Sequence, residues 1–201
     1  MTTKDLIMVT GMSGSGKTFV SFKLQDKYPE KYKVVVSTTT RPKRSGEVDG
    51  VHYHFVKEFP YDSCIQTTDF GGYTYGVDSK SIESVWEEGF TPVLVISPDG
   101  LEQVLKYYGV WEHIKINVVL CQTEISVALQ RMADRGDSAQ TLSARYVDMY
   151  SFSGDMEYLI PLMESSDVNC ESINTVVNIT NADIAQLVEK LTEQPRPLEV
   201  P

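Results

Sequence analysis

The sequence predicts an α/β fold in which a parallel sheet is flanked by helices. Three short apolar runs, Leu6–Val9, Pro92–Ile96 and Ile116–Leu120, have the length and composition of buried parallel strands. Helical patterns lie between such runs, and strands that alternate with helices favour a parallel sheet with right-handed crossovers. A chain of 201 residues is long enough to bury one core of this kind.

The other elements are predicted from the same patterns in chain order. A helix is expected from Thr18 to about Lys27, and a further buried strand from Tyr32 to Val36. The second half of the chain is expected to contain helices from Glu124 to about Ala133 and from Leu142 to about Tyr150, a last strand at Thr175–Ile179, and a closing helix from about Ala182 to Leu191. Residues 194–201 are expected to be a C-terminal tail.

Residues 37–89 differ in composition from the rest of the chain. This segment is polar and rich in glycine and tyrosine, and its apolar residues have little periodicity. We interpret it as a ligand-binding lobe inserted into a single domain of residues 1–193. The core of that domain would then comprise residues 1–36 and 90–193.

Charge and composition limit the possible functions. The formal net charge of −10 argues against general binding to nucleic acids, whose phosphates an acidic surface repels. Basic residues nevertheless cluster at Arg41, Lys43 and Arg44, and again at Arg131 and Arg135, which suits a small anionic ligand. No apolar run reaches the roughly 20 residues of a membrane helix. The three cysteines form no metal-binding pair, which favours a reducing, cytoplasmic location.

A phosphate-binding loop lies between the first predicted strand and the first predicted helix. Residues 11–18 read GMSGSGKT and match the pattern GxxxxGK[ST] without a mismatch. Glycines let successive backbone N–H groups point at phosphate oxygens, Lys17 is expected to reach the β- and γ-phosphates, and Thr18 is expected to bind Mg²⁺. The residues expected to bind the triphosphate are Gly11, Ser13, Gly14, Ser15, Gly16, Lys17 and Thr18.

Together with three further segments, this loop resembles the guanylate kinase family of nucleoside monophosphate kinases. The segment from Ser37 to Tyr53 resembles the part by which the family binds the monophosphate, and Phe70–Gly76 resembles its second monophosphate-contacting stretch. Arg131–Gly136, with Arg145 downstream, resembles the mobile lid. The resemblance covers about residues 5–190 and keeps the order of the family's motifs.

The resemblance implies a fold and an activity. It implies a P-loop NTPase fold with a monophosphate-binding lobe at about residues 37–89 and a helical lid at about residues 124–150. The expected reaction transfers the γ-phosphate of ATP, with Mg²⁺, to GMP, dGMP or a related nucleotide. The implied catalytic residues are Lys17, Arg131, Arg135 and Arg145, and those implied to hold the acceptor phosphate are Arg41, Arg44, Tyr53 and Tyr75. Small nucleotides are the expected partners, with no nucleic acid or membrane, and the protein is expected to be a monomer or homodimer.

The sequence departs from the family pattern around the acceptor base. The family has a glutamate where this chain has Gln66, a serine or threonine at Val77, and two aspartates at Val95 and Ser97. A carboxylate can accept hydrogen bonds from both the ring N–H and the exocyclic amine of guanine, whereas the amide of Gln66 offers one acceptor and one donor. The implied base-pocket residues are Ser37, Gln66, Val77 and Ser97. A pyrimidine acceptor such as dTMP, dUMP or a 5-substituted relative is therefore an alternative to guanine.

Two other functions compete with this interpretation. One is a non-catalytic binding module like the guanylate-kinase-like domains of membrane-associated scaffolds, but these typically lack an intact phosphate loop, and Lys17 and Thr18 are present here. The other is a P-loop kinase that acts on a different phosphorylated acceptor. A panel of monophosphates assayed with ATP separates all three.

Overall fold

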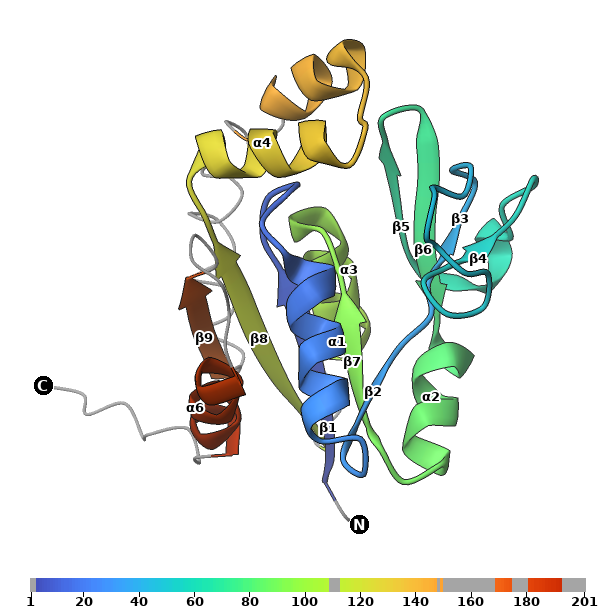
Figure 1. Cartoon of the computed structure of the whole chain (residues 1–201). Helices are drawn as coiled ribbons and strands as arrows, with labels where there is room; N and C mark the ends of the chain where they lie inside the picture. The colour runs from blue at the N-terminus through green and yellow to red at the C-terminus, as the bar shows by residue number, and fades with distance from the viewer. Residues whose placement is uncertain (1–2, 109–112, 148, 150–168, 175–180, 193–201) are drawn as a thin grey trace, which may run out of the picture.

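The chain folds around a five-stranded sheet in which every neighbouring pair of strands is parallel. Figure 1 shows the computed structural model, which describes residues 3–108, 113–147, 149, 169–174 and 181–192. The strand order is β2-β7-β1-β8-β9. The strands span Lys4–Thr10 (β1), Tyr32–Val34 (β2), Thr91–Val95 (β7), Ile114–Gln122 (β8) and Asn169–Asn174 (β9). The predicted parallel α/β fold is confirmed.

The two faces of this sheet bury separate hydrophobic clusters. Side chains alternate along a strand, so Leu6 and Met8 of β1 point to one face and Ile7 and Val9 to the other. The first face packs against α2 (Ser79–Glu87) and α3 (Pro98–Tyr108), and the second against α1 (Lys17–Lys27) and α6 (Asn181–Thr192). The fully apolar pattern of β1 follows from this burial on both faces.

Residues 38–78 contribute a second, smaller sheet with the strand order β4-β3-β6-β5. These strands span Thr38–Thr39 (β3), His54–Phe55 (β4), Cys64–Phe70 (β5) and Tyr73–Asp78 (β6), and the 3-10 helix η1 spans Tyr61–Ser63. Strands β5 and β6 form an antiparallel hairpin joined by Gly71 and Gly72, which both have positive φ. A two-residue turn with positive φ at both positions matches the twist of the flanking strands, and glycine adopts it without strain.

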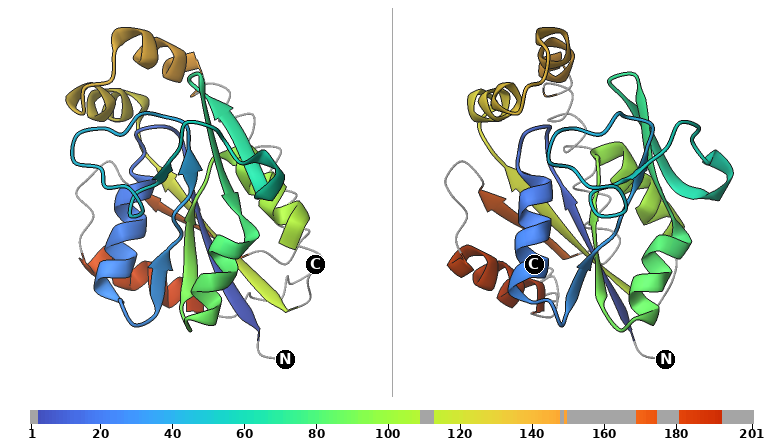
Figure 2. Two further views of the ribbon diagram at one scale, coloured as in Figure 1. Left: turned by 90° about the vertical axis from the view of Figure 1, so that its right-hand side faces the viewer. Right: turned by 45° about the vertical axis from the view of Figure 1, so that its right-hand side comes forward.

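Two helical segments lie beyond the carboxyl end of β8. Helix α4 (Ile125–Asp134) is followed, after a turn at 135–136, by a helical segment at 139–147, and we call residues 125–147 the lid. Met132 of α4 and Met149 are buried in a third hydrophobic cluster. Both views in Figure 2 show the lid above the carboxyl end of the parallel sheet, the end at which α/β proteins bind ligands.

Several elements differ from those predicted by the sequence patterns. Helix α2 lies within residues 37–89, which the sequence patterns assign wholly to the inserted lobe, and those patterns do not predict α3. The predicted strand at 175–179 lies outside the described residues, and β9 forms the last described strand at Asn169–Asn174 instead. No helix in the described part of the chain is both long and apolar enough to span a membrane.

Candidate active site

The phosphate loop lies where the connections of the parallel sheet change direction. It follows β1, whose neighbours β7 and β8 lie on opposite sides. Such a switch point is the usual place for a ligand in an open α/β sheet. Within the loop, Gly14 (φ 77°) and Gly16 (φ 89°) adopt a left-handed backbone. A Cβ atom on Gly14 would come within 2.5 Å of the Ala128 carbonyl oxygen of α4, so the loop and the lid pack together only because this residue is glycine.

Lys17 folds back over the loop that precedes it. Its Nζ atom donates hydrogen bonds to the carbonyl oxygens of Gly11 and Met12, at 2.7 and 2.9 Å. Burial, together with the positive charges of Arg145 and Arg135, lowers the pKa of Lys17 to about 8. The ammonium group is thus held beside the loop, where the positive helix end and the backbone N–H groups favour an anion.

The hydroxyl side chains of the loop have different surroundings. Ser15 is buried within the loop, whereas Thr18 is exposed in the first turn of α1. Ser13 accepts a hydrogen bond from Arg145. Thr18 is accordingly the hydroxyl that is open to a ligand beyond the loop.

Two of the predicted lid arginines reach the phosphate loop directly. Arg131 Nη1 donates to the Gly14 carbonyl at 3.4 Å, and Arg145 Nη1 donates to Ser13 Oγ at 2.7 Å. The Arg145 guanidinium also lies 4.5 Å from the ring centroid of Phe70, a cation–π distance. Arg135 instead binds Asp137, with Nε and Nη2 at 3.1 and 2.6 Å from Oδ2.

The two arginines predicted to hold an acceptor phosphate are organised by Glu47. Arg41 binds both carboxylate oxygens of Glu47, at 2.7 and 3.0 Å, and its side chain is only 6% exposed. The same carboxylate accepts the backbone N–H of Arg44 at 2.7 Å. Burial opposes ionisation of Glu47, but the hydrogen bonds and charges of the two arginines hold the pKa of Glu47 below its usual value.

Both predicted tyrosines lie beside Arg41. The ring centroids of Tyr53 and Tyr75 are 6.0 Å apart, and the Arg41 guanidinium carbon lies 5.5 Å from the Tyr53 centroid. Burial, supported by Tyr75, raises the pKa of Tyr53, so this phenol stays neutral and able to donate. The structure therefore brings together Tyr75 of β6 and three predicted residues of the connection between β3 and β4, namely Arg41, Arg44 and Tyr53.

The predicted base-pocket residues fall into two environments. Gln66 is buried, and its Nε2 donates to Thr68 Oγ1 at 2.8 Å, while Thr68 Oγ1 lies 3.1 Å from Ser97 Oγ. Ser97 Oγ also accepts the backbone N–H of Gly100 at the start of α3. Gln66, Thr68 and Ser97 thus form a network of neutral side chains at the end of β7.

Val77 and Ser37 have no part in that network of side chains. Val77 is 1% exposed and packs in the hydrophobic cluster shared with α2 and α3. Ser37 is partly buried and directly precedes β3. Its carbonyl oxygen accepts a hydrogen bond from the His54 backbone N–H, which joins this part of the chain to β4. Val95, at the other position where the resemblance implies an aspartate, is partly buried at the end of β7.

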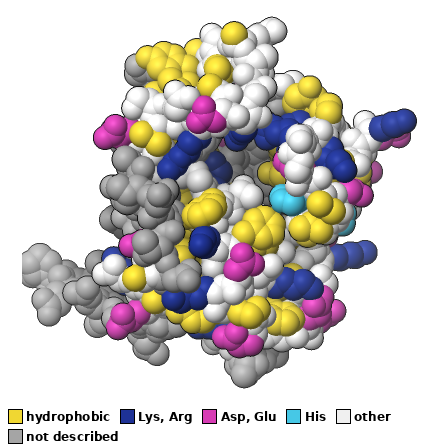
Figure 3. All heavy atoms as spheres, viewed as in Figure 1, with side chains coloured by type: hydrophobic (Ala, Val, Ile, Leu, Met, Phe, Trp, Pro, Cys, Tyr) yellow, Lys and Arg dark blue, Asp and Glu magenta, His cyan; other side chains and the backbone are white. Residues whose placement is uncertain are grey.

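Figure 3 shows Lys and Arg side chains around a hollow between the lid and the second sheet. The phosphate loop lies below the lid at this end of the molecule (Figure 1). Positive charge around a concave surface attracts phosphate groups even on a chain with an acidic total charge. The hollow therefore has the charge that a nucleotide phosphate site requires.

Three residues of this region were not predicted as site residues, namely Glu47, Thr68 and Asp137. Each lies within three positions of a residue that was predicted. A carboxylate close in sequence to clustered arginines is a usable signal for Glu47 and Asp137, because such arginines need a counter-charge when buried. Thr68 offers no comparable signal.

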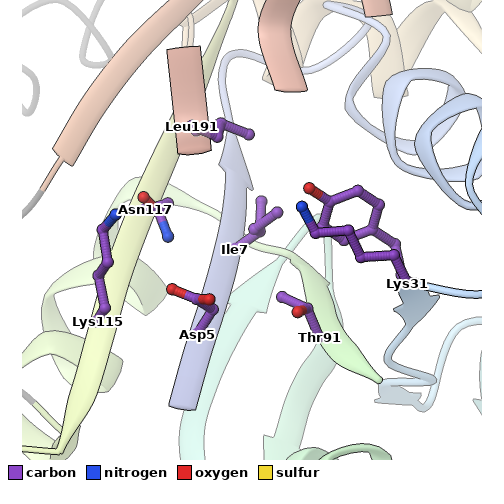
Figure 4. A pocket seen from close by; sticks show the side chains of 8 residues that line it. Asp5, Ile7, Lys31, Thr91, Lys115, Asn117 and Leu191 are labelled. Carbon is purple, nitrogen blue, oxygen red and sulfur yellow. The ribbon is translucent and has the colours of Figure 1, made fainter. Parts of the chain in front are cut away.

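A small cavity of about 130 Å³ lies at the opposite end of the parallel sheet. It opens between the beginnings of β1, β7 and β8 and the end of α6, and Figure 4 shows Asp5, Lys31, Lys115 and Asn117 around it. This is the amino end of the strands, away from the phosphate loop. Among the described residues, no group of three or more His, Cys, Asp or Glu side chains is placed to hold a metal ion.

A phosphate loop at a switch point, followed by a lid whose arginines contact that loop, defines a P-loop phosphotransferase. The family model described as guanylate kinase matches residues 3–178. The chain belongs to the guanylate kinase family, and it is accordingly an ATP-dependent nucleoside monophosphate kinase of guanylate kinase type.

Individual relatives agree with this assignment. A guanylate kinase of Methylobacillus flagellatus is 34% identical over 149 residues, which cover 70% of this chain and 71% of the relative. A guanylate kinase of Helicobacter pylori is 31% identical, with 73% and 72% covered. The crystal structure of guanylate kinase from Anaplasma phagocytophilum superposes with a TM-score of 0.56 at 20% identity, covering 95% and 85% of the two chains, and supports the fold.

Proposed function

We propose that the protein transfers the γ-phosphate of Mg²⁺-bound ATP to a nucleoside monophosphate in the hollow between the phosphate loop, the lid and the second sheet. The observation that supports this most strongly is the convergence of Arg44, from the connection between β3 and β4, with Arg135 and Arg145 of the lid. All three are within 3.6 Å of the Asp137 carboxylate. Phosphoryl transfer depends chiefly on positioning and positive charge, which this arrangement supplies.

The donor end of the proposed site is the phosphate loop. Backbone N–H groups of Gly11–Thr18 would hold the β- and γ-phosphates, and Lys17 would turn from its carbonyl partners to the phosphate oxygens. The exposed Thr18 hydroxyl fits a Mg²⁺ ligand, and water and phosphate oxygens can complete the coordination. When bound, Mg²⁺ would neutralise charge on the phosphates.

The acceptor end of the proposed site is the second sheet. Arg41 and Arg44 would bind the monophosphate through charge-assisted hydrogen bonds, and Tyr53 and Tyr75 would add neutral donors. Arg131, Arg135 and Arg145 would contact the transferring phosphoryl group from the lid. In this proposal residues 37–78 form the monophosphate-binding lobe of a single domain, and α2 belongs to the core of that domain.

For the acceptor base, GMP or dGMP is the first candidate, in keeping with the family. A pyrimidine deoxynucleotide is the second candidate, and the Gln66–Thr68–Ser97 network favours it. This network contains no carboxylate, whereas guanine presents two adjacent donors that a carboxylate matches. The neutral Gln66 amide would accept from one guanine donor but place its own N–H group against the other. Such a buried mismatch costs about 1–3 kcal/mol.

The test is a panel of all common NMPs and dNMPs, assayed for diphosphate formation with ATP and Mg²⁺ and also with EDTA. We expect turnover of at least one monophosphate, which EDTA abolishes. A full panel without product, combined with tight nucleotide binding, would instead favour the non-catalytic module. Activity confined to a phosphorylated compound outside the panel would favour a different P-loop kinase.

The base preference is tested in the same assay with the double variant Gln66→Glu/Ser97→Asp. If the neutral network selects the base, the variant should gain kcat/KM for GMP relative to dTMP by about tenfold or more, since hydrogen-bonding sites discriminate steeply. If the parent protein already prefers GMP over every pyrimidine nucleotide, the pyrimidine candidate is wrong and guanine is the acceptor base. Thr67→Ser, on the same strand, is the matched control and should leave the preference order unchanged.

A further inference from the structure

Three arginines from different parts of the chain meet at the carboxylate of Asp137. Arg135 contacts Oδ2 at 2.6 Å, Arg145 Nε lies 3.6 Å from the same oxygen, and Arg44 Nη2 lies 3.4 Å from Oδ1. The Asp137 side chain is only 4% exposed, so these charges are partly shielded from water. Burial opposes ionisation of this carboxyl, but Arg135, Arg44 and Arg145 hold the pKa of Asp137 below its usual value.

Asp137 is also the middle of a continuous polar connection between the proposed acceptor and donor ends. On one side, Arg44 leads through its backbone N–H to Glu47, which holds Arg41. On the other side, Arg145 leads to the Ser13 hydroxyl of the phosphate loop. The lid, the second sheet and the phosphate loop are therefore joined through one carboxylate.

The charges explain why a carboxylate is needed at this point. The positive charge of Arg135 contributes, after burial, to lowering the pKa of both Arg44 and Arg145, so the guanidinium groups repel one another. One carboxylate among three guanidinium groups offsets part of this repulsion and leaves two positive charges in excess. That excess suits the binding of a further anion, as a phosphoryl group is.

We propose that Asp137 is a positioning residue that holds Arg44, Arg135 and Arg145 together. Binding of the acceptor phosphate and closure of the lid then order the same three guanidinium groups around the transferring phosphoryl group. This inference rests on the proposed phosphotransfer function. Asp137 acts through the arginines and does not itself contact the phosphates. Its loss therefore lowers kcat more than it weakens ATP binding, because the misplaced groups act mainly in the transition state.

The first experiment compares Asp137→Asn with Asp134→Asn, both measured with the best acceptor from the panel. Asp134 is exposed in α4, three positions away, and accepts a hydrogen bond from Gln130, so its substitution makes the same change of charge outside the cluster. We expect kcat of Asp137→Asn to fall about tenfold or more, with KM for ATP within about twofold of the parent value. The control should keep the parent kcat, and Asp137→Glu, which retains the charge, should fall in between.

A double-mutant cycle separates positioning from general support of the fold. If Asp137 acts through Arg135, the tenfold loss should shrink to less than about threefold when Asp137→Asn is made in an Arg135→Ala background. The proposal would be overturned if the kcat losses of the two single variants multiplied fully in the double variant. It would also be overturned if the Asp137→Asn enzyme kept the parent kcat. Thermal unfolding of each variant identifies any that fails to fold, and Asp137→Glu then takes its place in the cycle.

Amide hydrogen exchange of residues 125–147 in nucleotide-free protein gives a readout that needs no activity. Asp137→Asn should exchange faster than the parent protein throughout the lid, and Asp134→Asn should not, because only the first substitution breaks the connection to Arg44. Unchanged lid exchange would contradict the proposal even if no acceptor were found. A parent protein without kinase activity would count against the proposed function alone.

Discussion

Arg145 Nη1 donates a hydrogen bond of 2.7 Å to the Ser13 hydroxyl, although 132 positions separate the two residues in the sequence. The same guanidinium lies over the Phe70 ring of the β5–β6 hairpin. One lid side chain thus contacts both the phosphate loop and the second sheet. A group in that position can respond to a nucleotide bound at either end of the proposed site.

We expect the planar shape of Arg145 to matter as well as its charge. Arg145→Lys keeps the charge but loses stacking on Phe70 and the fork of donors, so kcat should fall by about ten- to a hundredfold, equivalent to about 1.5–3 kcal/mol. Steady-state kinetics of the lysine and alanine variants measure this. An Arg145→Ala enzyme with at least half of the parent kcat would exclude the residue from the reaction.

The lowered pKa of Lys17 predicts a pH dependence in the free enzyme. Since this pKa is about 8, Lys17 loses its positive charge as the pH rises through that value, and kcat/KM for ATP should fall above it. Lys17→Arg should shift the decline to higher pH, because arginine stays protonated. A profile of the parent enzyme that stays flat to about pH 9.5 would contradict the assignment.

Replacing Lys17 by methionine should abolish most of the catalysis and leave the fold intact. The ammonium group is expected to interact most strongly with charge that develops on the transferring phosphoryl group, so kcat should fall by roughly 10²–10³ or more. Single-turnover assays measure the rate, and circular dichroism checks the fold. Near-normal turnover would mean that the loop only binds nucleotide.

Glu47 should control binding of the monophosphate through Arg41 and Arg44. Glu47→Gln removes the charge that holds the Arg41 guanidinium, so KM for the acceptor should rise about tenfold while KM for ATP changes little. Glu58→Gln, at an exposed position, is the matched control. Arg41→Ala and Arg44→Ala should likewise weaken acceptor binding far more than ATP binding, and equal losses for both nucleotides would move these residues out of the acceptor site.

The burial of Val77 predicts a stability effect. Val77→Thr keeps the shape of the side chain but places a hydroxyl in the cluster between the sheets and α2, so the free energy of unfolding should fall by about 1–3 kcal/mol. Urea denaturation measures the loss. A threonine variant as stable as the parent protein would show that the hydroxyl finds a partner and that this position tolerates the polar residue that the family resemblance implies.

Much of the fold could be predicted because it follows from local patterns. Short apolar runs predicted β1, β7 and β8, and the phosphate-loop motif placed the turn before α1. Helix α2 was missed, although Asp78 caps its first turn and Ile82 and Val85 recur at helical spacing. The surrounding polar residues concealed that signal, because burial of this helix depends on a sheet formed by distant segments.

The phosphate loop, the parallel core and the two arginine clusters follow from the sequence alone, because each is encoded by residues that are neighbours along the chain. Tertiary packing, in contrast, makes Arg44, Arg135 and Arg145 share the Asp137 carboxylate and places Val77 in the core. Buried charges take whichever partners the packing of the lid and the second sheet brings within hydrogen-bonding reach. That packing is set by contacts between elements far apart in the sequence, which no local pattern records.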